Sequence, residues 1–163
     1  MNKAIYAGSF DPITYGHLDI LERSCAIFDT VYVSVLENPE KEAVFTPKER
    51  IEMIQELCEG NPKVKVESFS GLLVDYAESI GVYTLVRGIR AVSDFDYEFQ
   101  LSHTNRLLNQ KIETVFFMSD AKYSYLSSSV VRQLADLSGD IRHFVPDPVA
   151  KKLKAVNLKE ART

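Results

Sequence analysis

The stretch Gly8-Ser9-Phe10-Asp11-Pro12-Ile13-Thr14-Tyr15-Gly16-His17 decides the fold that this chain is expected to adopt. An apolar run at residues 4–7 precedes it, and apolar residues recur at helical intervals from Leu18 to Phe28. This order predicts a strand, a tight loop and a helix. Asp11-Pro12 favours a turn, and we expect Gly8 and Gly16 to supply backbone freedom and close approach. A helix start with free N–H groups favours a phosphate, and His17 adds another donor there.

Length, composition and charge favour a single globular domain over residues 1–163. The chain is 45% hydrophobic and has a net charge of −4. A chain with net negative charge has no overall positive potential to attract nucleic acid or a membrane surface, so we expect neither as a partner. The chain has no apolar run long enough to cross a membrane and begins with a strand pattern, which predicts a soluble, cytoplasmic protein. Cys25 and Cys58 lie beside apolar residues without metal-ligand spacing, and we expect packed, reduced thiols.

Alternating strand and helix patterns predict an α/β fold of the Rossmann-like, doubly wound kind, with a parallel five-stranded sheet and helices on both faces. Strands are expected at residues 4–7, 31–36, 64–67, 83–86 and 114–118. The third has the alternation of an exposed or edge strand, and the last is expected in the core. Helices are expected from His17 and over 47–59, 72–80, 93–109, 130–137 and from 147, with 157–163 as a frayed tail. Thr46 with Glu49 forms a capping-box pattern, and Ser93 is a candidate cap.

Three of the predicted strands lead directly into unusual polar segments. These are residues 8–17, 87–90 and 122–129, and Lys41 follows the second strand. In parallel sheets the ligand site lies beyond the carboxyl ends of the strands, at the point where the strand order reverses. We therefore expect these four segments to meet at one edge of the sheet.

Each polar residue also has an ordinary structural interpretation. Lys41 alone suits a solvated loop, Asp11 a turn, and Glu98 a helix surface. Arg87-Gly88-Ile89-Arg90 suits phosphate oxygens better than a core, and three serines at 127–129 before a helix suit a second phosphate cradle. No nucleophilic serine with its own base, paired catalytic carboxylates or P-loop lysine is evident, which argues against hydrolases and P-loop enzymes.

Three motifs together resemble the nucleotidylyltransferase superfamily with the His-x-Gly-His signature. They are Gly-Ser-Phe-Asp-Pro-Ile-Thr-x-Gly-His at 8–17, Arg-Gly-Ile-Arg at 87–90 and Ser-Ser-Ser-x-x-Arg at 127–132. Within that superfamily the chain most resembles the bacterial phosphopantetheine adenylyltransferases. Thr14 occupies the place of the first signature histidine, while Ala7 and Tyr123 stand where proline and tryptophan are common.

The resemblance implies transfer of AMP from ATP to 4′-phosphopantetheine, giving dephospho-CoA and pyrophosphate in coenzyme A biosynthesis. It also implies Mg²⁺ carried mainly by ATP and water without a protein metal site, a homohexamer, and feedback inhibition by coenzyme A. An acceptor phosphate is already anionic near pH 7, so direct in-line attack needs no general base or covalent intermediate. Two alternatives stay open: a sister transferase with another phosphate acceptor, such as nicotinate mononucleotide, and a non-catalytic ATP-binding regulatory module.

The same resemblance implies roles for particular residues. The catalytic set is His17, as transition-state stabiliser, with Lys41 and Arg90. The acceptor set is Ser9, Lys41, Leu73 and Arg87. The ATP set is Ser9, Phe10, His17, Gly88, Ile89, Arg90, Glu98, Tyr123, Ser124, Tyr125, Leu126, Ser127, Ser128 and Ser129.

Overall fold

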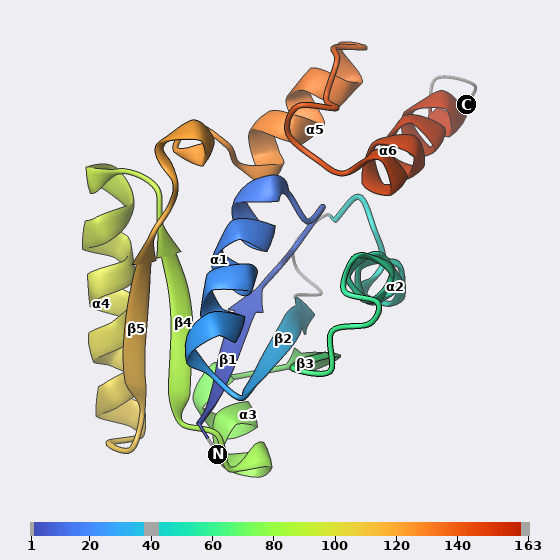
Figure 1. The fold of residues 1–163 in the computed structure, drawn as a ribbon. Helices are drawn as coiled ribbons and strands as arrows, with labels where there is room; N and C mark the ends of the chain where they lie inside the picture. Colours follow the sequence, from blue (N-terminus) through green and yellow to red (C-terminus); the bar gives the residue numbers. More distant parts are fainter. Residues whose placement is uncertain (1, 38–42, 161–163) are drawn as a thin grey trace.

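Five parallel strands form the centre of the molecule in the computed structural model, which describes residues 2–37 and 43–160, with side chains up to residue 156. The strands are β1 (Lys3–Gly8), β2 (Thr30–Glu37), β3 (Val64–Ser70), β4 (Thr84–Ile89) and β5 (Glu113–Met118). Their order is β3-β2-β1-β4-β5, and every neighbouring pair is parallel (Figure 1). The chain winds outward from β1 to β3 and then crosses to β4. The strand order therefore reverses between β1 and β4, as the doubly wound prediction requires.

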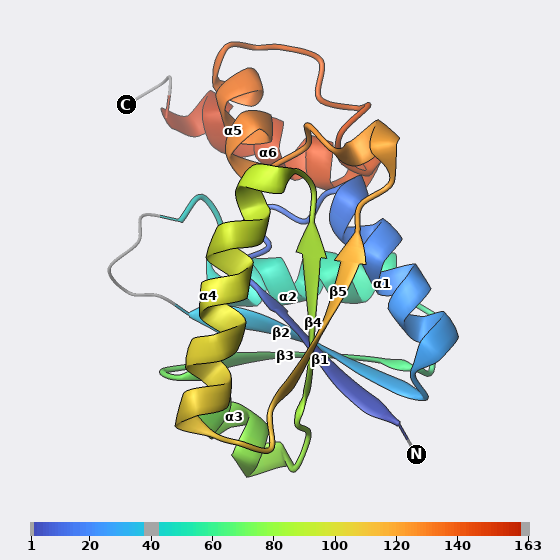
Figure 2. The same ribbon diagram turned by 90° about the vertical axis from the view of Figure 1, so that its left-hand side faces the viewer.

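Helices cover both faces of this sheet. Helices α1 (Tyr15–Ile27) and α2 (Pro47–Leu57) lie on one face, and α3 (Leu73–Ile80) and α4 (Val92–Leu108) on the other (Figures 1 and 2). Side chains alternate along β1: Ala4 and Tyr6 join the core under α1 and α2, whereas Ile5 and Ala7 join the core under α3. The predicted single-domain α/β fold is confirmed.

Two further helices lie over the carboxyl edge of the strands. They are α5 (Ser128–Asp136) and α6 (Asp147–Glu160), and Figure 1 shows them above α1 and the end of β1. Val131 and Leu153 extend the first core upward into this layer. Helix α6 reaches into the segment expected to be a frayed tail, whose last three residues lie outside the described part of the chain. The two helices therefore cover the carboxyl edge of the sheet next to the place where the predicted polar segments meet.

Local sequence signals set most of the helix ends. Thr46 accepts a hydrogen bond from the Glu49 N–H, and the Glu49 carboxylate accepts one from the Thr46 N–H, which confirms the predicted capping box. Gly81 ends α3 in the left-handed conformation, at a φ of 64°. The candidate cap at Ser93 is wrong, because α4 begins at Val92 and has no side-chain cap.

Two strands differ from the sequence-based expectation. β4 continues to Ile89, so Arg87 and Gly88 lie within a strand and not in a loop. The strand continues because it pairs with β5 through Ile89, a partner that the sequence does not reveal. β5 is an edge strand and not a central one, whereas β3 occupies an edge as predicted.

Both cysteines are free thiols, as expected. Burial raises the pKa of each, that of Cys58 to about 11. A thiol with a raised pKa is a weak nucleophile at neutral pH, so the two side chains serve packing. Within the described chain, no helix has the length and apolar character needed to cross a membrane.

Candidate active site

A cleft of about 300 Å³ opens at the carboxyl ends of β1 and β4, where the strand order reverses. Its walls come from the loop after β1, the start of α1, the end of β4, helix α4 and the start of α5. The lining residues are Tyr6, Ala7, Gly8, Ser9, Phe10, Thr14, Gly16, His17, Ile20, Arg87, Gly88, Arg90, Glu98, Ser119, Leu126, Ser127, Ser128 and Ser129. Residues from three of the four segments predicted to meet thus do so, although two of these segments lie more than 100 residues apart in sequence, while the fourth, at Lys41, lies outside the described residues.

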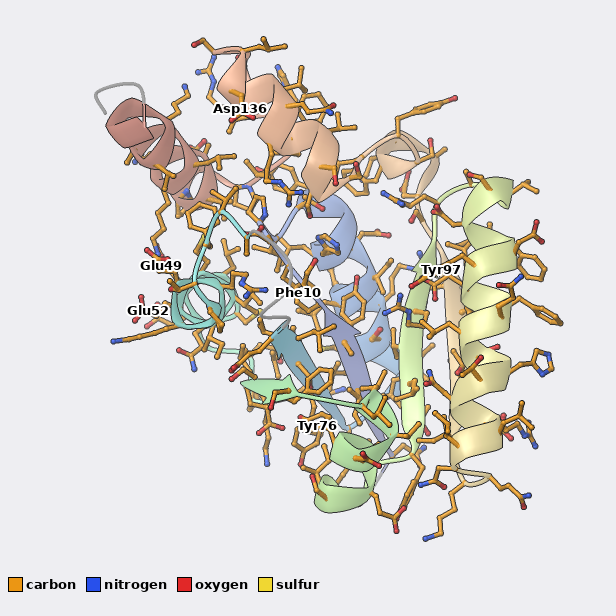
Figure 3. All side chains as sticks on the ribbon, turned by 180° about the vertical axis from the view of Figure 1, so that it is seen from behind. Phe10, Glu49, Glu52, Tyr76, Tyr97 and Asp136 are labelled. Atoms are coloured by element: carbon orange, nitrogen blue, oxygen red, sulfur yellow. The ribbon has the colours of Figure 1, made fainter. Side chains whose placement is uncertain are left out.

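The loop after β1 makes its sharp change of direction at Phe10. Phe10 has a φ of 47°, a left-handed conformation that is unfavourable for any residue with a Cβ. Its ring is buried between Tyr6 and His17, with edge-to-face centroid distances of 5.3 and 5.2 Å, and Figure 3 shows it between α1 and α2. The expectation that Gly8 supplies the backbone freedom is wrong: Gly8 ends β1, and a Cβ there would lie 3.2 Å from the Phe10 ring. Packing of the aromatic ring compensates the unfavourable backbone.

His17 is held in one tautomer by the start of α1. The backbone N–H of Thr14 donates to Nδ1 of His17 at 3.1 Å, and the Thr14 hydroxyl lies 3.0 Å from the same nitrogen. A backbone N–H can only donate, so Nδ1 carries no proton and the neutral ring carries its proton on Nε2. Burial, with the nearby positive charges of Arg90 and Arg87, lowers the pKa of His17 to about 4. At neutral pH the ring therefore presents a neutral Nε2–H donor.

Thr14 itself is the N-cap of α1 and is 1% exposed. Its hydroxyl accepts a hydrogen bond from the backbone N–H of His17 while the imidazole accepts one from the backbone of Thr14. This is the geometry of a capping box with an imidazole in place of the usual carboxylate. The residue at the place of the first signature histidine therefore orients the second.

Arg87 and Glu98 form an ion pair between β4 and α4. The guanidinium donates from Nε and Nη2 to the two carboxylate oxygens at 2.7 and 2.6 Å, and from Nη1 to the carbonyl of Ala7 at 2.9 Å. Glu98 is 8% exposed, so the interpretation of Glu98 as a surface carboxylate is wrong. Bidentate pairing with Glu98 fixes the guanidinium plane at the cleft, and the hydrogen bond to Ala7 joins β4 to the end of β1.

Arg90 joins the end of β4 to the loop before α5. Its Nε and Nη2 donate to the carboxylate of Asp94 at 2.9 and 3.2 Å, and its Nη1 donates to the carbonyl of Leu126 at 3.2 Å. The side chain is 39% exposed, more than that of Arg87, at 23%. Arg90 therefore keeps contact with solvent and with the cleft at once.

The three serines at the start of α5 have different positions. Ser127 is the N-cap and accepts a hydrogen bond from the Val130 N–H at 3.2 Å, and Ser128 donates to the carbonyl of Pro12 at 2.8 Å. Ser129 is exposed at the cleft, and its hydroxyl makes no hydrogen bond within the described residues. The three successive serines thus have three roles: Ser127 caps the helix, Ser128 binds the first loop, and Ser129 offers an available hydroxyl donor.

Asp11 does more than shape its own turn, the role expected of it. Asp11 is 4% exposed, and its carboxylate accepts hydrogen bonds from the N–H groups of Val44 and Phe45 at 3.0 and 2.9 Å and pairs with Arg132 at 3.3 Å. Arg132 also donates to the carbonyl of Asp11 at 2.5 Å. The first loop is therefore tied to the segment before α2 and to α5.

Comparison with known proteins agrees with this architecture. Residues 5–134 match the sequence model of a family described as cytidylyltransferase-like. The chain belongs to the cytidylyltransferase-like family. This match confirms the superfamily part of the resemblance, that of the nucleotidylyltransferases.

Two solved structures share the fold of this cytidylyltransferase-like chain. One, from Vibrio parahaemolyticus, is described as a nicotinate-nucleotide adenylyltransferase; it is 18% identical, with a TM-score of 0.66, and the match covers 94% of this chain and 99% of that one. The other is the Plasmodium falciparum nicotinic acid mononucleotide adenylyltransferase complexed with NaAD, 17% identical with a TM-score of 0.65, over 98% and 95% of the two chains. Both confirm the Rossmann-like domain.

Most of the predicted site residues of this cytidylyltransferase-like domain line the cleft. They are Ser9, Phe10, His17, Arg87, Gly88, Arg90, Glu98, Leu126, Ser127, Ser128 and Ser129. Lys41 lies outside the described residues. The roles in binding and catalysis stay predictions for all of them.

Five predicted residues do not line this cleft. Leu73 packs against the core under α3, Ile89 is 3% exposed within the sheet, and Tyr125 is 93% exposed. Tyr123 stacks on Tyr15 at a centroid distance of 6.5 Å. The fifth is Ser124, which donates to the carbonyl of Ala121 and so closes a local turn.

Other residues of the cleft wall were in none of the predicted site sets. Gly8, Thr14 and Gly16 belong to the segment at 8–17 that was expected here, whereas sequence reasoning missed Tyr6, Ala7, Ile20 and Ser119. Two of these wall residues carried a recognisable signal: Thr14 lies three residues before His17, the spacing of a capping box, and Ser119 directly follows a predicted strand. No sequence pattern indicated Ile20, because its contact is with Gly88 on a distant strand. A Cβ at Gly88 would lie 2.2 Å from the Ile20 Cδ1 atom.

Proposed function

We propose that this chain is an adenylyltransferase that moves AMP from ATP to the phosphate of a small acceptor. The observation that carries the proposal is the fixed neutral imidazole of His17, which has its proton on Nε2 and lines a cleft together with two arginines and the start of α5. In the reaction an acceptor phosphate oxygen forms a bond to the α-phosphorus, and the bond from that phosphorus to the β-phosphate bridging oxygen breaks. Pyrophosphate leaves with the bonding electrons, and no proton transfer is required.

The residues of the cleft supply position and electrostatic stabilisation. In the transition state, negative charge grows on the oxygens around the α-phosphorus, and an oriented N–H donor stabilises it without reorganisation. The pKa of His17, about 4, keeps the ring neutral throughout the neutral range, and the Thr14 N–H at Nδ1 leaves the single ring proton on Nε2. Arg87 and Arg90 add positive charge that Glu98 and Asp94 hold in place.

Two acceptors are candidates. The first is 4′-phosphopantetheine, which would give dephospho-CoA in coenzyme A biosynthesis; it is supported by the motifs at 8–17, 87–90 and 127–132. The second is nicotinate mononucleotide. The comparisons favour this second acceptor, because both solved structures are described as adenylyltransferases of the nicotinate nucleotide.

Other properties implied by the resemblance are part of the same proposal. Mg²⁺ held mainly by ATP phosphates and water belongs to the proposal by resemblance. Mg²⁺ would add charge neutralisation to the triphosphate. Assembly as a hexamer and inhibition by coenzyme A are proposed from the resemblance alone.

The proposal is tested by incubating the purified chain with ATP, Mg²⁺ and each acceptor in turn, and measuring pyrophosphate release and product mass. Dephospho-CoA would support the first acceptor, and nicotinic acid adenine dinucleotide the second. The matched control is His17→Ala, which should bind ATP but turn over slowly. Binding of ATP without transfer to any acceptor would indicate the regulatory module and overturn the proposal.

A further inference from the structure

Arg50 is a buried cation beneath the first loop, outside the set of residues that line the cleft. It belongs to α2 and is 4% exposed. Its Nη1 donates to the carbonyls of Ser9 and Leu36 at 2.7 and 3.3 Å, and its Nε donates to the carbonyl of Thr46 at 3.4 Å. One guanidinium thereby holds the first loop, the end of β2 and the cap of α2.

The charge of Arg50 has no carboxylate partner among residues 2–37 and 43–156. The three other arginines around the site each have one. Their pairs are Arg87 with Glu98, Arg90 with Asp94, and Arg132 with Asp11. Burying a charge is costly unless it is compensated. An anion in the cleft above the Ser9 loop would supply the missing compensation for Arg50.

The geometry of the Ser9–Phe10 peptide connects Arg50 to the cleft. A trans peptide is planar, so its C=O and N–H point in opposite directions. The Ser9 carbonyl points to Arg50, which directs the Phe10 N–H away from the guanidinium. Within the described residues that N–H makes no hydrogen bond, and both Ser9 and Phe10 line the cleft. The left-handed backbone of Phe10, at a φ of 47°, keeps this orientation only while its surroundings hold it.

We propose that Arg50 is a positioning residue: it fixes the Ser9–Phe10 peptide so that the Phe10 N–H binds a phosphate oxygen of the nucleotide. The cation on the carbonyl polarises the peptide and makes the N–H a stronger donor, because hydrogen bonds in series reinforce one another. The inference rests on the proposed function, since it takes the ligand of the cleft to be ATP.

The test follows the Phe10 amide by NMR in protein labelled with ¹⁵N-phenylalanine, on addition of ATP alone. In the wild type and in the control Lys48→Met, which removes an exposed charge from the same helix, ATP should move the Phe10 proton signal downfield. In Arg50→Met the shift should vanish, and the Kd for ATP should rise roughly tenfold to hundredfold, as expected for the loss of a hydrogen bond to a charged group. Arg50→Lys should be intermediate, because an ammonium cannot reproduce the fork of the guanidinium.

Three outcomes would overturn the proposal. They are a wild-type Phe10 signal that ATP does not move, an Arg50→Met protein that binds ATP as the wild type does, and an Arg50→Lys protein with an undiminished shift. Circular dichroism checks the folding of each variant, and if Arg50→Met does not fold, Arg50→Lys and the wild type decide. If the chain transferred AMP to no acceptor, the proposed function would be wrong. The role of Arg50 would still be decided by the NMR experiment, because that experiment contains ATP and no acceptor.

Discussion

Helices α1 and α5 both begin at the cleft, and both have a hydroxyl side chain as N-cap, yet they present different groups. At α1 the N–H groups of Tyr15 and His17 are bound to the Phe144 carbonyl and to the Thr14 hydroxyl. Thr14 and His17 also bind each other's backbone and side chain. At the start of α1 the N–H groups of Tyr15 and His17 are therefore satisfied within the protein, and the side chain that remains available as a donor is the neutral imidazole.

At α5 the serines leave more groups available. Ser127 caps the helix and Ser128 ties it to Pro12, but the Ser129 hydroxyl makes no bond to the described residues. A helix start with available donors binds negative charge that already exists, whereas a single oriented donor is most effective where charge develops. We expect α1 to determine turnover and α5 to determine affinity for ATP.

The largest expected effect comes from His17→Ala. Loss of one oriented donor should lower kcat by about 10² to 10³. The KM for ATP should change little, because α5 and the arginines keep the nucleotide in place. Steady-state kinetics with a melting curve as folding control measures this. A near-normal kcat would remove the distinction between the two helix starts.

A smaller effect is expected from Lys41→Ala, which changes neither helix start. If this lysine binds the acceptor phosphate, its loss should raise the KM of the acceptor roughly tenfold to hundredfold, as expected for a charge-assisted hydrogen bond. ATP binding, measured by calorimetry, should stay near the wild-type value. A selective loss of ATP affinity would instead place the lysine beside the nucleotide.

Gly88→Ala should disturb α1 and leave α5 unaffected. The new Cβ would lie 2.2 Å from the Ile20 Cδ1 atom, and overpacking of this kind costs about 1 to 3 kcal/mol of unfolding free energy. Ile20→Val removes that carbon, and the next Ile20 atom lies at 3.6 Å. The double variant should therefore be closer to wild-type stability than Gly88→Ala is, as urea unfolding can show; an unrelieved loss would mean that another contact is responsible.

The neutral His17 also makes stability depend on pH. Between its ordinary pKa near 6.5 and its folded value of about 4, the unfolded chain binds a proton that the folded chain does not. The free energy of unfolding should therefore fall as the pH falls, by at most about 1.4 kcal/mol per pH unit. Urea unfolding at pH 5 and 6.5, compared with His17→Gln, isolates this slope. Equal slopes in the two proteins would contradict the lowered pKa.

The smallest expected effect belongs to Ser129→Ala. One neutral hydrogen bond contributes about 0.5 to 1.5 kcal/mol, so the KM for ATP should rise roughly twofold to tenfold while kcat stays constant. Ser79→Ala, at an exposed position on α3, is the matched control. If kcat fell in place of ATP affinity, α5 would act on the transition state as α1 does.

Local patterns in the sequence were sufficient to predict the order of strands and helices and the position of the cleft. The stretch at 8–17 carries its own turn and helix start, and Thr46 with Glu49 carries a cap. The sequence predicted a loop for Arg87 and a surface position for Glu98. Both predictions were wrong because the pairing of β4 with β5 and the packing of α4 involve residues that are distant in the sequence. No sequence pattern indicated the contacts of Arg50, because its three hydrogen-bond acceptors are backbone carbonyls, which every residue type has.

The sequence by itself determined the doubly wound order of elements and brought His17 to the carboxyl edge of the sheet, because hydrophobic period and turn chemistry act between near neighbours. Only the tertiary structure decided which charges are compensated and where the donors point. Those depend on contacts such as Arg132 with Asp11 and Arg50 with Ser9, which join residues 121 and 41 positions apart. Such contacts exist only after the layers have packed, so no stretch of the chain encodes them alone.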